Sequence, residues 1–394
     1  MKRYYLRGIG AALLVLASAP PQLAAAATLK ATLIVPAEDA RLTRSRLERG
    51  YLGHPGGSAG DGVRVALQEA KIELEGGTAN VVLDTLEVAD AAAASAAAQR
   101  AEKAGAAALL TDLPAAWTLA VADAAPKLPV LNIGNASDNL READCRKQLF
   151  HLLPSDRMRA DALAQTLVAR KWLNVLLLTG PTPLDAQRST VAQAAIKRFG
   201  LKLVANKPFK LSADPRERDL ASPALLTSAS LGNYDAVWVV DSDGEFAAGL
   251  PYRTALPRPV VGDAGLVSLA WHDKFDRFGA PQVSRRLARA TQPASRAMTA
   301  QDWAAWMAGK ALVAAALAAP KQSVAQVLAT AELDGSKGVT MSFRPWDGQL
   351  RQPLLLSDGQ SVIAMAPVDG MLHPKNTLDT LGADAPEKLC KARQ

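Results

Sequence analysis

The stretch DAAAASAAAQRAEKAGAAALLTD, residues 90–112, contains the alternation that decides the fold of this chain. Asp90 can cap a helix, the alanine-rich segment after it has high helix propensity, and Gly105 is suited to ending that helix. The apolar run at 106–111 then has the length of a buried strand. A helix followed directly by a buried strand is the repeating unit of a parallel α/β sheet.

The same unit recurs before and after this stretch. Apolar runs at 31–36 and 79–86 flank a segment of helical periodicity at 61–74, and a helix at 114–126 precedes a strand at 128–134. A second series of helices and strands occupies 156–171, 173–180, 184–200, 201–209, 222–230, 234–241 and 258–263. The chain is therefore predicted to be α/β, with two doubly wound Rossmann-like lobes in tandem.

Beyond residue 265 the pattern changes. A long helix is predicted at 302–319, and turn signals at 347–348 and 358–359 separate apolar segments within 339–367. The last region is therefore predicted to add a β hairpin to the second lobe.

The N-terminus has the form of a secretory signal peptide, residues 1–26. Lys2, Arg3 and Arg7 precede a short apolar core, which runs into small residues near Ala27. We therefore expect a mature protein that is periplasmic and soluble. The formal charge of the whole chain is +7, and three of these charges belong to the signal peptide, so the mature chain lacks the strong basic excess of a nucleic-acid-binding protein.

The two cysteines, Cys145 and Cys390, allow one disulfide in an oxidising compartment. It would tie the C-terminal tail to the middle of the chain. The alternative is two separate thiols. The spacing of the two cysteines does not suggest a metal site.

Signatures of catalysis are scarce, and we expect no enzymatic activity. The glycine-rich segment GHPGGSAGDG, residues 53–62, lacks the lysine and hydroxyl residue of a P-loop, and no G-x-S-x-G motif occurs. The four histidines do not have zinc-ligand spacing, so no catalytic or metal residue is assigned.

Ligands of open parallel sheets bind beyond the carboxyl ends of the strands. We therefore expect the binding residues in six loops, at 36–39, 112–114, 134–138, 180–185, 241–245 and 262–265. The polar candidates in these loops are Asp112, Asn135, Ser137, Asp241 and Asp263. The alternative for each is an ordinary helix cap.

The stretch 260–320 combines three tryptophans with five arginines. An aromatic plane beside guanidinium groups suits a flat polycarboxylate. Trp303 and Trp306, three residues apart on one helix face, are interpreted as core, whereas Trp271 follows a strand end and is assigned to the site.

A signal peptide, two α/β lobes and no catalytic set together resemble the periplasmic ligand-binding proteins of ABC importers, in the type I, amino-acid-binding branch. The resemblance implies a hinge of three chain crossings, which we place near Pro154, Gly265 and Gly335. Lobe 1 is then 27–154 plus 266–335, and lobe 2 is 155–265 plus 336–394.

The segments 138–163, 278–290 with the later 296–308, and 342–359 are similar to the subgroup associated with pyrroloquinoline-quinone-dependent alcohol oxidation. This resemblance implies capture of pyrroloquinoline quinone (PQQ) or a related small acid, as ligand rather than catalytic cofactor. Arg46, Arg141 and Arg253, all near strand ends, are candidates for its carboxylates. The segment 41–62 is more basic than the small polar loop of amino-acid binders.

The implied partners are a small molecule and an ABC importer membrane subunit or a periplasmic quinoprotein dehydrogenase, and we expect a monomer that binds no nucleic acid. One alternative keeps the fold and replaces the ligand by an amino acid or an alcohol-derived carboxylate. A third hypothesis is a periplasmic sensor or interaction module without a deep cleft.

Overall fold

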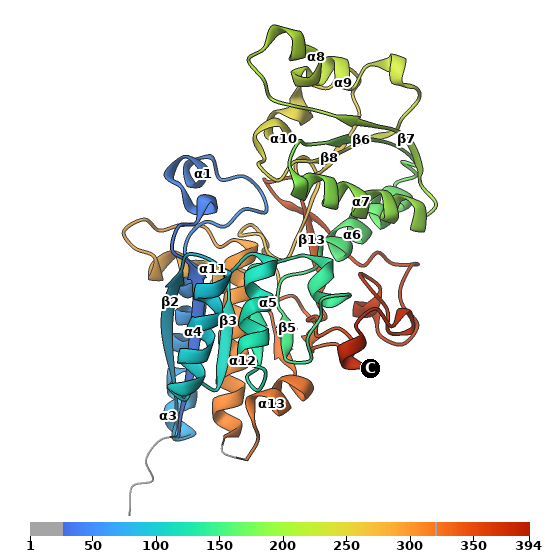
Figure 1. Ribbon diagram of the computed structural model, residues 1–394. Helices are drawn as coiled ribbons and strands as arrows, with labels where there is room; N and C mark the ends of the chain where they lie inside the picture. The colour runs from blue at the N-terminus through green and yellow to red at the C-terminus, as the bar shows by residue number, and fades with distance from the viewer. Residues whose placement is uncertain (1–26, 320) are drawn as a thin grey trace, which may run out of the picture.

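The computed structural model describes residues 27–319 and 321–394, which form two α/β lobes placed end to end (Figure 1). The predicted signal peptide lies outside the described residues. Each lobe has a parallel sheet with helices on both faces, so the α/β prediction is confirmed. Within the described part of the chain, the helices are too short or too polar to cross a bilayer.

Lobe 1 contains a five-stranded parallel sheet of order β2-β1-β3-β4-β5. Its strands are β1 (Ala27–Pro36), β2 (Ala79–Val88), β3 (Ala108–Thr111), β4 (Val130–Asn132) and β5 (Leu149–His151). Its helices are α1 (Arg44–Arg49), α2 (Ala59–Glu69), α3 (Lys71–Gly76), α4 (Ala91–Lys103), α5 (Ala115–Ala124), α11 (Ala280–Ala290), α12 (Ala300–Ala318) and α13 (Val324–Thr330). Two short strands, β11 (Leu333–Asp334) and β12 (Thr340–Met341), pair with each other.

The stretch that begins at Asp90 folds as its sequence predicts. The Asp90 carboxylate accepts a hydrogen bond from the Ala93 amide at 2.7 Å and so caps α4. Gly105 follows this helix in the left-handed region, with φ +81°, and every residue of β3 is buried. Helices α4 and α5 cover one face of the sheet, and α2 and α12 cover the other.

Lobe 2 contains a four-stranded parallel sheet of order β7-β6-β8-β9. Its strands are β6 (Asn174–Thr179), β7 (Lys202–Pro208), β8 (Ala236–Val240) and β9 (Val260–Gly262). Its helices are α6 (Asp156–Ala169), α7 (Pro183–Arg198), α8 (Arg218–Ala221), α9 (Pro223–Leu226) and α10 (Glu245–Gly249).

An antiparallel sheet of β10 (Val267–Leu269), β13 (Leu354–Ser357) and β14 (Val362–Ala366) lies between the lobes. β13 and β14 form a hairpin whose turn contains the predicted signal at 358–359. β5 of lobe 1 ends at His151 and α6 of lobe 2 begins at Asp156, while β9 of lobe 2 ends at Gly262 and β10 begins at Val267. Met341, Phe343 and Leu350, which follow the third crossing predicted near Gly335, pack in the lobe 1 core.

Two glycines set the close contact between α2 and α12. A Cβ atom at Gly62 would lie 2.3 Å from the Asp302 carbonyl, and one at Gly309 would lie 2.6 Å from the Ala66 Cβ. The absence of these side chains lets the two backbones approach. Helix α12 is consequently buried on nearly all sides and packs as part of lobe 1, to which it was predicted to return.

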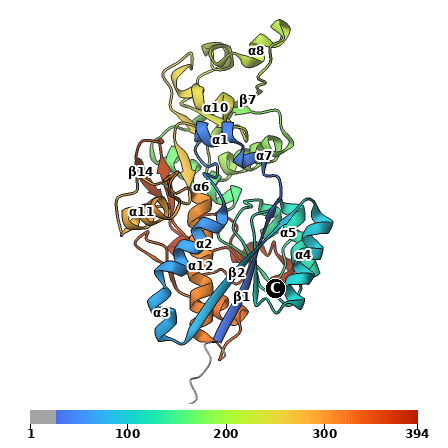
Figure 2. The same ribbon diagram turned by 90° about the vertical axis from the view of Figure 1, so that its left-hand side faces the viewer.

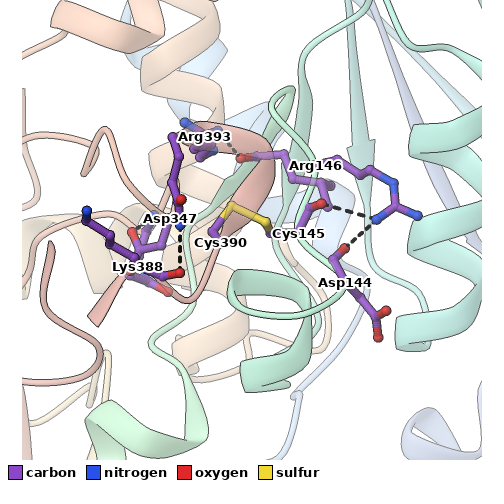
Figure 3. Close-up of a disulfide and its surroundings, with 10 residues drawn as sticks. Asp144, Cys145, Arg146, Asp347, Lys388, Cys390 and Arg393 are labelled. Carbon is purple, nitrogen blue, oxygen red and sulfur yellow. Dashed lines mark hydrogen bonds between the residues drawn. A yellow bond between two sulfur atoms is a disulfide. The ribbon is translucent and has the colours of Figure 1, made fainter. Parts of the chain in front are cut away.

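Cys145 and Cys390 are joined by a disulfide bond, which links the C-terminal segment to the loop before β5 (Figure 3). Arg393 reinforces this attachment, since its guanidinium donates to the Leu149 carbonyl and lies 4.9 Å from the centre of the Phe150 ring. The end of the chain, which was assigned to lobe 2, is therefore anchored against lobe 1.

Candidate ligand-binding site

A cavity of about 660 Å³ lies between the two lobes, where the carboxyl ends of their strands face each other. Strand order reverses between β1 and β3 in lobe 1 and between β6 and β8 in lobe 2, which is where open α/β sheets bind ligands. Each of the six loops predicted from the sequence contributes at least one residue to the wall. Both lobes therefore share one site.

The lobe 1 wall is organised by the loop after β4. The Asn132 side chain accepts from the Asn135 amide at 3.0 Å and donates to the Asn135 carbonyl at 2.8 Å. The Asn135 side chain in turn accepts from the Ser137 amide at 2.9 Å. Ala115, the first residue of α5, also lines the cavity, and no side chain in the described residues caps this helix. The N-terminus of α5, which is the positive end of its helix dipole, therefore lies at the cavity wall.

The lobe 2 wall is formed by two arginines and two aspartates. Arg188 of α7 donates to Asp263 at 2.5 Å and lies 3.5 Å from Asp156. Arg159 of α6 donates its Nε to the Ser268 carbonyl at 3.2 Å, while its terminal nitrogens lie 3.8 Å from the carboxylates of Asp156 and Asp263. Burial and the neighbouring Arg188 lower the pKa of Arg159.

A segment of lobe 1 reaches across the cavity to lobe 2; Figure 2 shows its helix, α1, next to α10. Arg46 donates to Asp243 at 2.7 Å, and Arg49 lies 3.3 Å from Glu245. The Tyr51 ring packs on Gly244, where a Cβ atom would come within 2.8 Å of the ring. We call these contacts, between residues 46–51 and 243–245, the interlobe latch.

Four of the nine candidate residues line the cavity: Arg46, Asn135, Ser137 and Asp263. The structure thus brings residues from both lobes together at one place, as the loop argument predicts. Their contacts with a ligand remain a prediction.

Asp112 and Arg141 lie behind the lobe 1 wall. Asp112 accepts from Arg41, which lines the cavity, at 2.8 Å, and burial raises the pKa of this carboxyl group. The Arg141 guanidinium donates to the carbonyls of Ser137 and Leu153 at 2.8 and 3.0 Å. Burial lowers the pKa of Arg141 to about 10, so it stays charged at neutral pH while supporting the loop.

Asp241 and Arg253 are not on the cavity wall. Asp241 accepts from the Ala247 amide at 2.9 Å and so holds the start of α10. Arg253 is exposed at the end of the short helix that follows α10. The arginine lies three residues beyond the buried Leu250, and its position in that turn directs it to solvent rather than to the cavity.

Trp271 is also absent from the cavity wall and belongs to the core. It is 1% exposed, its ring stacks on Trp303 with 6.3 Å between ring centres, and its Nε1 donates to Ser284. Ala270, one residue earlier, faces the cavity instead. Burial of the large indole among apolar neighbours stabilises this orientation. Trp303 and Trp306 are buried, as predicted for core residues.

Sequence reasoning missed several residues of the wall: Arg41, Trp117, Asp156, Arg159, Arg188 and Gln301. Asp156 and Arg159 occupy the first turn of the helix after the first crossing, which is a signal that could have identified them. The others lie on helices whose cavity-facing side depends on the placement of the opposite lobe.

The fold and the cavity define a two-lobed protein of the ligand-binding class. A model of the periplasmic binding protein family matches residues 50–250, about half of the chain, and the chain belongs to this family. It is a family of binding proteins rather than enzymes.

Solved structures support the same fold. A periplasmic binding protein from Burkholderia mallei superimposes with a TM-score of 0.66 at 13% identity, covering 93% of this chain and 99% of that one. An ABC transporter solute-binding protein from R. palustris in complex with benzoate has a TM-score of 0.62 at 13% identity, covering 86% and 96%.

The leucine-, isoleucine-, valine-, threonine- and alanine-binding protein from Brucella ovis, in its closed conformation, has a TM-score of 0.64 at 16% identity, covering 84% and 89%. No curated protein matches the sequence significantly. The type I periplasmic binding protein fold, predicted from the sequence, is confirmed by these structures.

Proposed function

We propose that this protein is the solute-binding component of an ABC importer and captures one small organic acid between its lobes by hinge closure. The observation that carries the proposal is the interlobe cavity, whose volume of about 660 Å³ is in the usual range of small-ligand sites. A site shared by two lobes couples binding to their closure.

The sequence resemblance makes PQQ, or a small acid of the same metabolism, the first ligand to test. Four arginines on the wall and the partly exposed ring of Trp117 support an acidic ligand with a flat or apolar body. The alternative ligands are an amino acid or an alcohol-derived carboxylate. Structures of similar fold contain benzoate or are described as binding leucine, which favours testing these two compounds as well.

The proposed location is the periplasm, and the proposed partner is the membrane subunit of an importer or a periplasmic quinoprotein dehydrogenase. The signal peptide predicted at 1–26 supports this location. The disulfide between Cys145 and Cys390 also supports it, because disulfides persist in oxidising compartments. A sensor or interaction module is less well supported, since it does not need a cavity of this depth.

The proposal is tested by titrating the mature protein with PQQ, benzoate, leucine and glutamate while following tryptophan fluorescence and thermal unfolding. We expect one compound to quench fluorescence saturably and to raise the melting temperature. A Trp117→Phe variant should lose most of the quenching, because this ring lines the cavity. If no small acid or amino acid changes either signal, the proposal fails.

The interlobe latch predicts a moderate effect on affinity. The double variant Asp243→Ala, Glu245→Ala removes two ion pairs that join the lobes beside the cavity. Exposed pairs contribute roughly 0.2 to 1 kcal/mol each, so affinity should fall about fivefold, mainly through faster dissociation.

Stopped-flow displacement of bound ligand measures this dissociation rate. The matched control is Asp214→Ala, Glu217→Ala, which removes two ion pairs that lie entirely within lobe 2. An equal rate change in both double variants would show that the latch has no specific role.

A further inference from the structure

We infer that Arg159 is the group that receives the ligand carboxylate, and that the site selects an organic monocarboxylate with an apolar body. The inference rests on the proposed function and narrows its ligand class. The four arginines that line the cavity differ in their hydrogen bonds.

Three of the four arginines on the wall already have a carboxylate partner within hydrogen-bonding distance. Arg41 donates to both oxygens of Asp39, Arg46 donates to Asp243, and Arg188 donates to Asp263. These charge-assisted bonds satisfy the guanidinium groups in the absence of a ligand.

Arg159 is different. Its Nε is fixed by the Ser268 carbonyl, but within residues 27–319 and 321–394 its Nη1 and Nη2 have no hydrogen-bond acceptor. The aspartates at 3.8 Å are beyond hydrogen-bonding distance. The side chain is 21% exposed and lines the cavity, and its terminal nitrogens are not among the fully buried polar atoms of the described residues, so they are accessible to a ligand from the cavity. A carboxylate can accept from both terminal nitrogens at once.

The guanidinium group of Arg159 lies against the lobe 1 loop that contains Gly53 and His54. Gly53, in the loop that covers the cavity from lobe 1, has φ +80°, and a Cβ atom there would lie 3.5 Å from Nη2 of Arg159. His54 adds no fixed positive charge, because burial lowers its pKa. The guanidinium is thus held between the lobes, where closure would enclose a bound anion.

The charge balance of the wall limits the ligand to few carboxylates. Four guanidinium groups, of residues 41, 46, 159 and 188, stand against four carboxylates, of residues 38, 39, 156 and 263. The terminal nitrogens of Arg159 can donate to one carboxylate. The second and third carboxylates of a tricarboxylate would lie near acidic side chains and would have no unpaired guanidinium group to bind. A tricarboxylate such as PQQ therefore fits less well than a monocarboxylate.

The rest of the wall is suited to an apolar body. Its hydrophobic members come from both lobes and from the hinge: Leu52, Pro55, Leu113, Trp117, Leu153, Leu184 and Leu269. Contact with these side chains favours an aromatic or branched aliphatic acid.

The test is calorimetric titration of the full mature protein with benzoate, benzamide, 4-methylpentanoate, leucine and PQQ. We expect a monocarboxylate to bind more tightly than PQQ and about 100-fold more tightly than its amide. The Arg159→Gln variant should lose about 30- to 100-fold in affinity for that acid, and Arg159→Lys about tenfold, because a lysine keeps the charge but not the paired donors.

Arg170→Gln is the matched control, since Arg170 is an exposed residue at the other end of α6. It should leave the affinity unchanged. Circular dichroism establishes that each variant is folded, and Arg159→Lys serves if Arg159→Gln does not fold.

Equal affinity of wild type and both Arg159 variants for a bound acid overturns the inference and leaves the proposed function standing. If PQQ or the amide binds more tightly than the monocarboxylate, the inference is also overturned, and the proposed function still stands. If the wild type binds none of the compounds, the proposed function fails together with the inference.

Discussion

Replacing Trp271 by alanine is expected to destabilise the protein by about 3 to 5 kcal/mol while leaving the affinity of the folded protein for its ligand nearly unchanged. The indole is 1% exposed and packs against Trp303 and Phe275 in the lobe 1 core. Its removal leaves a large cavity among side chains that relax only partly. Urea unfolding and calorimetric titration measure the two effects separately.

Trp117→Ala is the matched comparison. Trp117 is only partly buried and lines the interlobe cavity, so this variant should lose affinity with a much smaller loss of stability. The opposite pattern, in which Trp271→Ala is stable but binds weakly, would restore Trp271 to the site.

Replacing Arg141 by methionine is expected to cost about 3 to 5 kcal/mol of stability. The Arg141 guanidinium is buried and donates to Gln349 at 2.7 Å as well as to the carbonyls of Ser137 and Leu153. The substitution leaves the Gln349 side-chain oxygen and the Ser137 carbonyl without this donor, and leaves the Leu153 carbonyl with only the Gln349 amide, at 3.0 Å. The loop that carries Asn135 and Ser137 also loses its support, so ligand affinity should fall as a secondary effect.

Arg146→Met provides the control, because Arg146 is in the same segment but pairs with Asp123 at the surface. It should change the free energy of unfolding by less than about 1 kcal/mol. If Arg141→Met unfolds at the same urea concentration as wild type and only binding is lost, Arg141 is a ligand residue and not a support.

The fold could be predicted from the sequence because its signals are local. The Asp90 cap, the alanine-rich helix and the buried run that forms β3 lie within one short stretch, and the same unit recurs along both lobes. The loops after the strands could be assigned to the site for the same reason. The carboxyl ends of parallel strands all lie at one edge of the sheet, which is where ligands of such sheets bind.

The individual site residues were harder to predict because they depend on contacts between distant segments. Arg159 faces the cavity only because α6 begins directly after the first crossing and a loop of lobe 1 covers it. Trp271 and Ala270 are neighbours in sequence, yet they face opposite sides, and periodicity over one irregular segment does not decide which one meets the ligand.

The position of the third crossing also could not be predicted from local sequence signals. Residues 341–350 contain turn and strand signals that suit either lobe, and their packing against the lobe 1 core fixes their place. The C-terminal segment is likewise positioned by the disulfide at Cys145, which is 245 residues away in sequence. Both features depend on long-range contacts and not on local propensity.

We propose that the interlobe cavity binds one small carboxylate. This proposal is tested most directly by calorimetric titration of the wild-type protein with each acid and with its neutral amide. We expect at least one acid to bind with a stoichiometry of one, and its amide to bind about 100-fold more weakly. Binding of the amide as tightly as the acid, or no binding by any acid, would contradict the proposal.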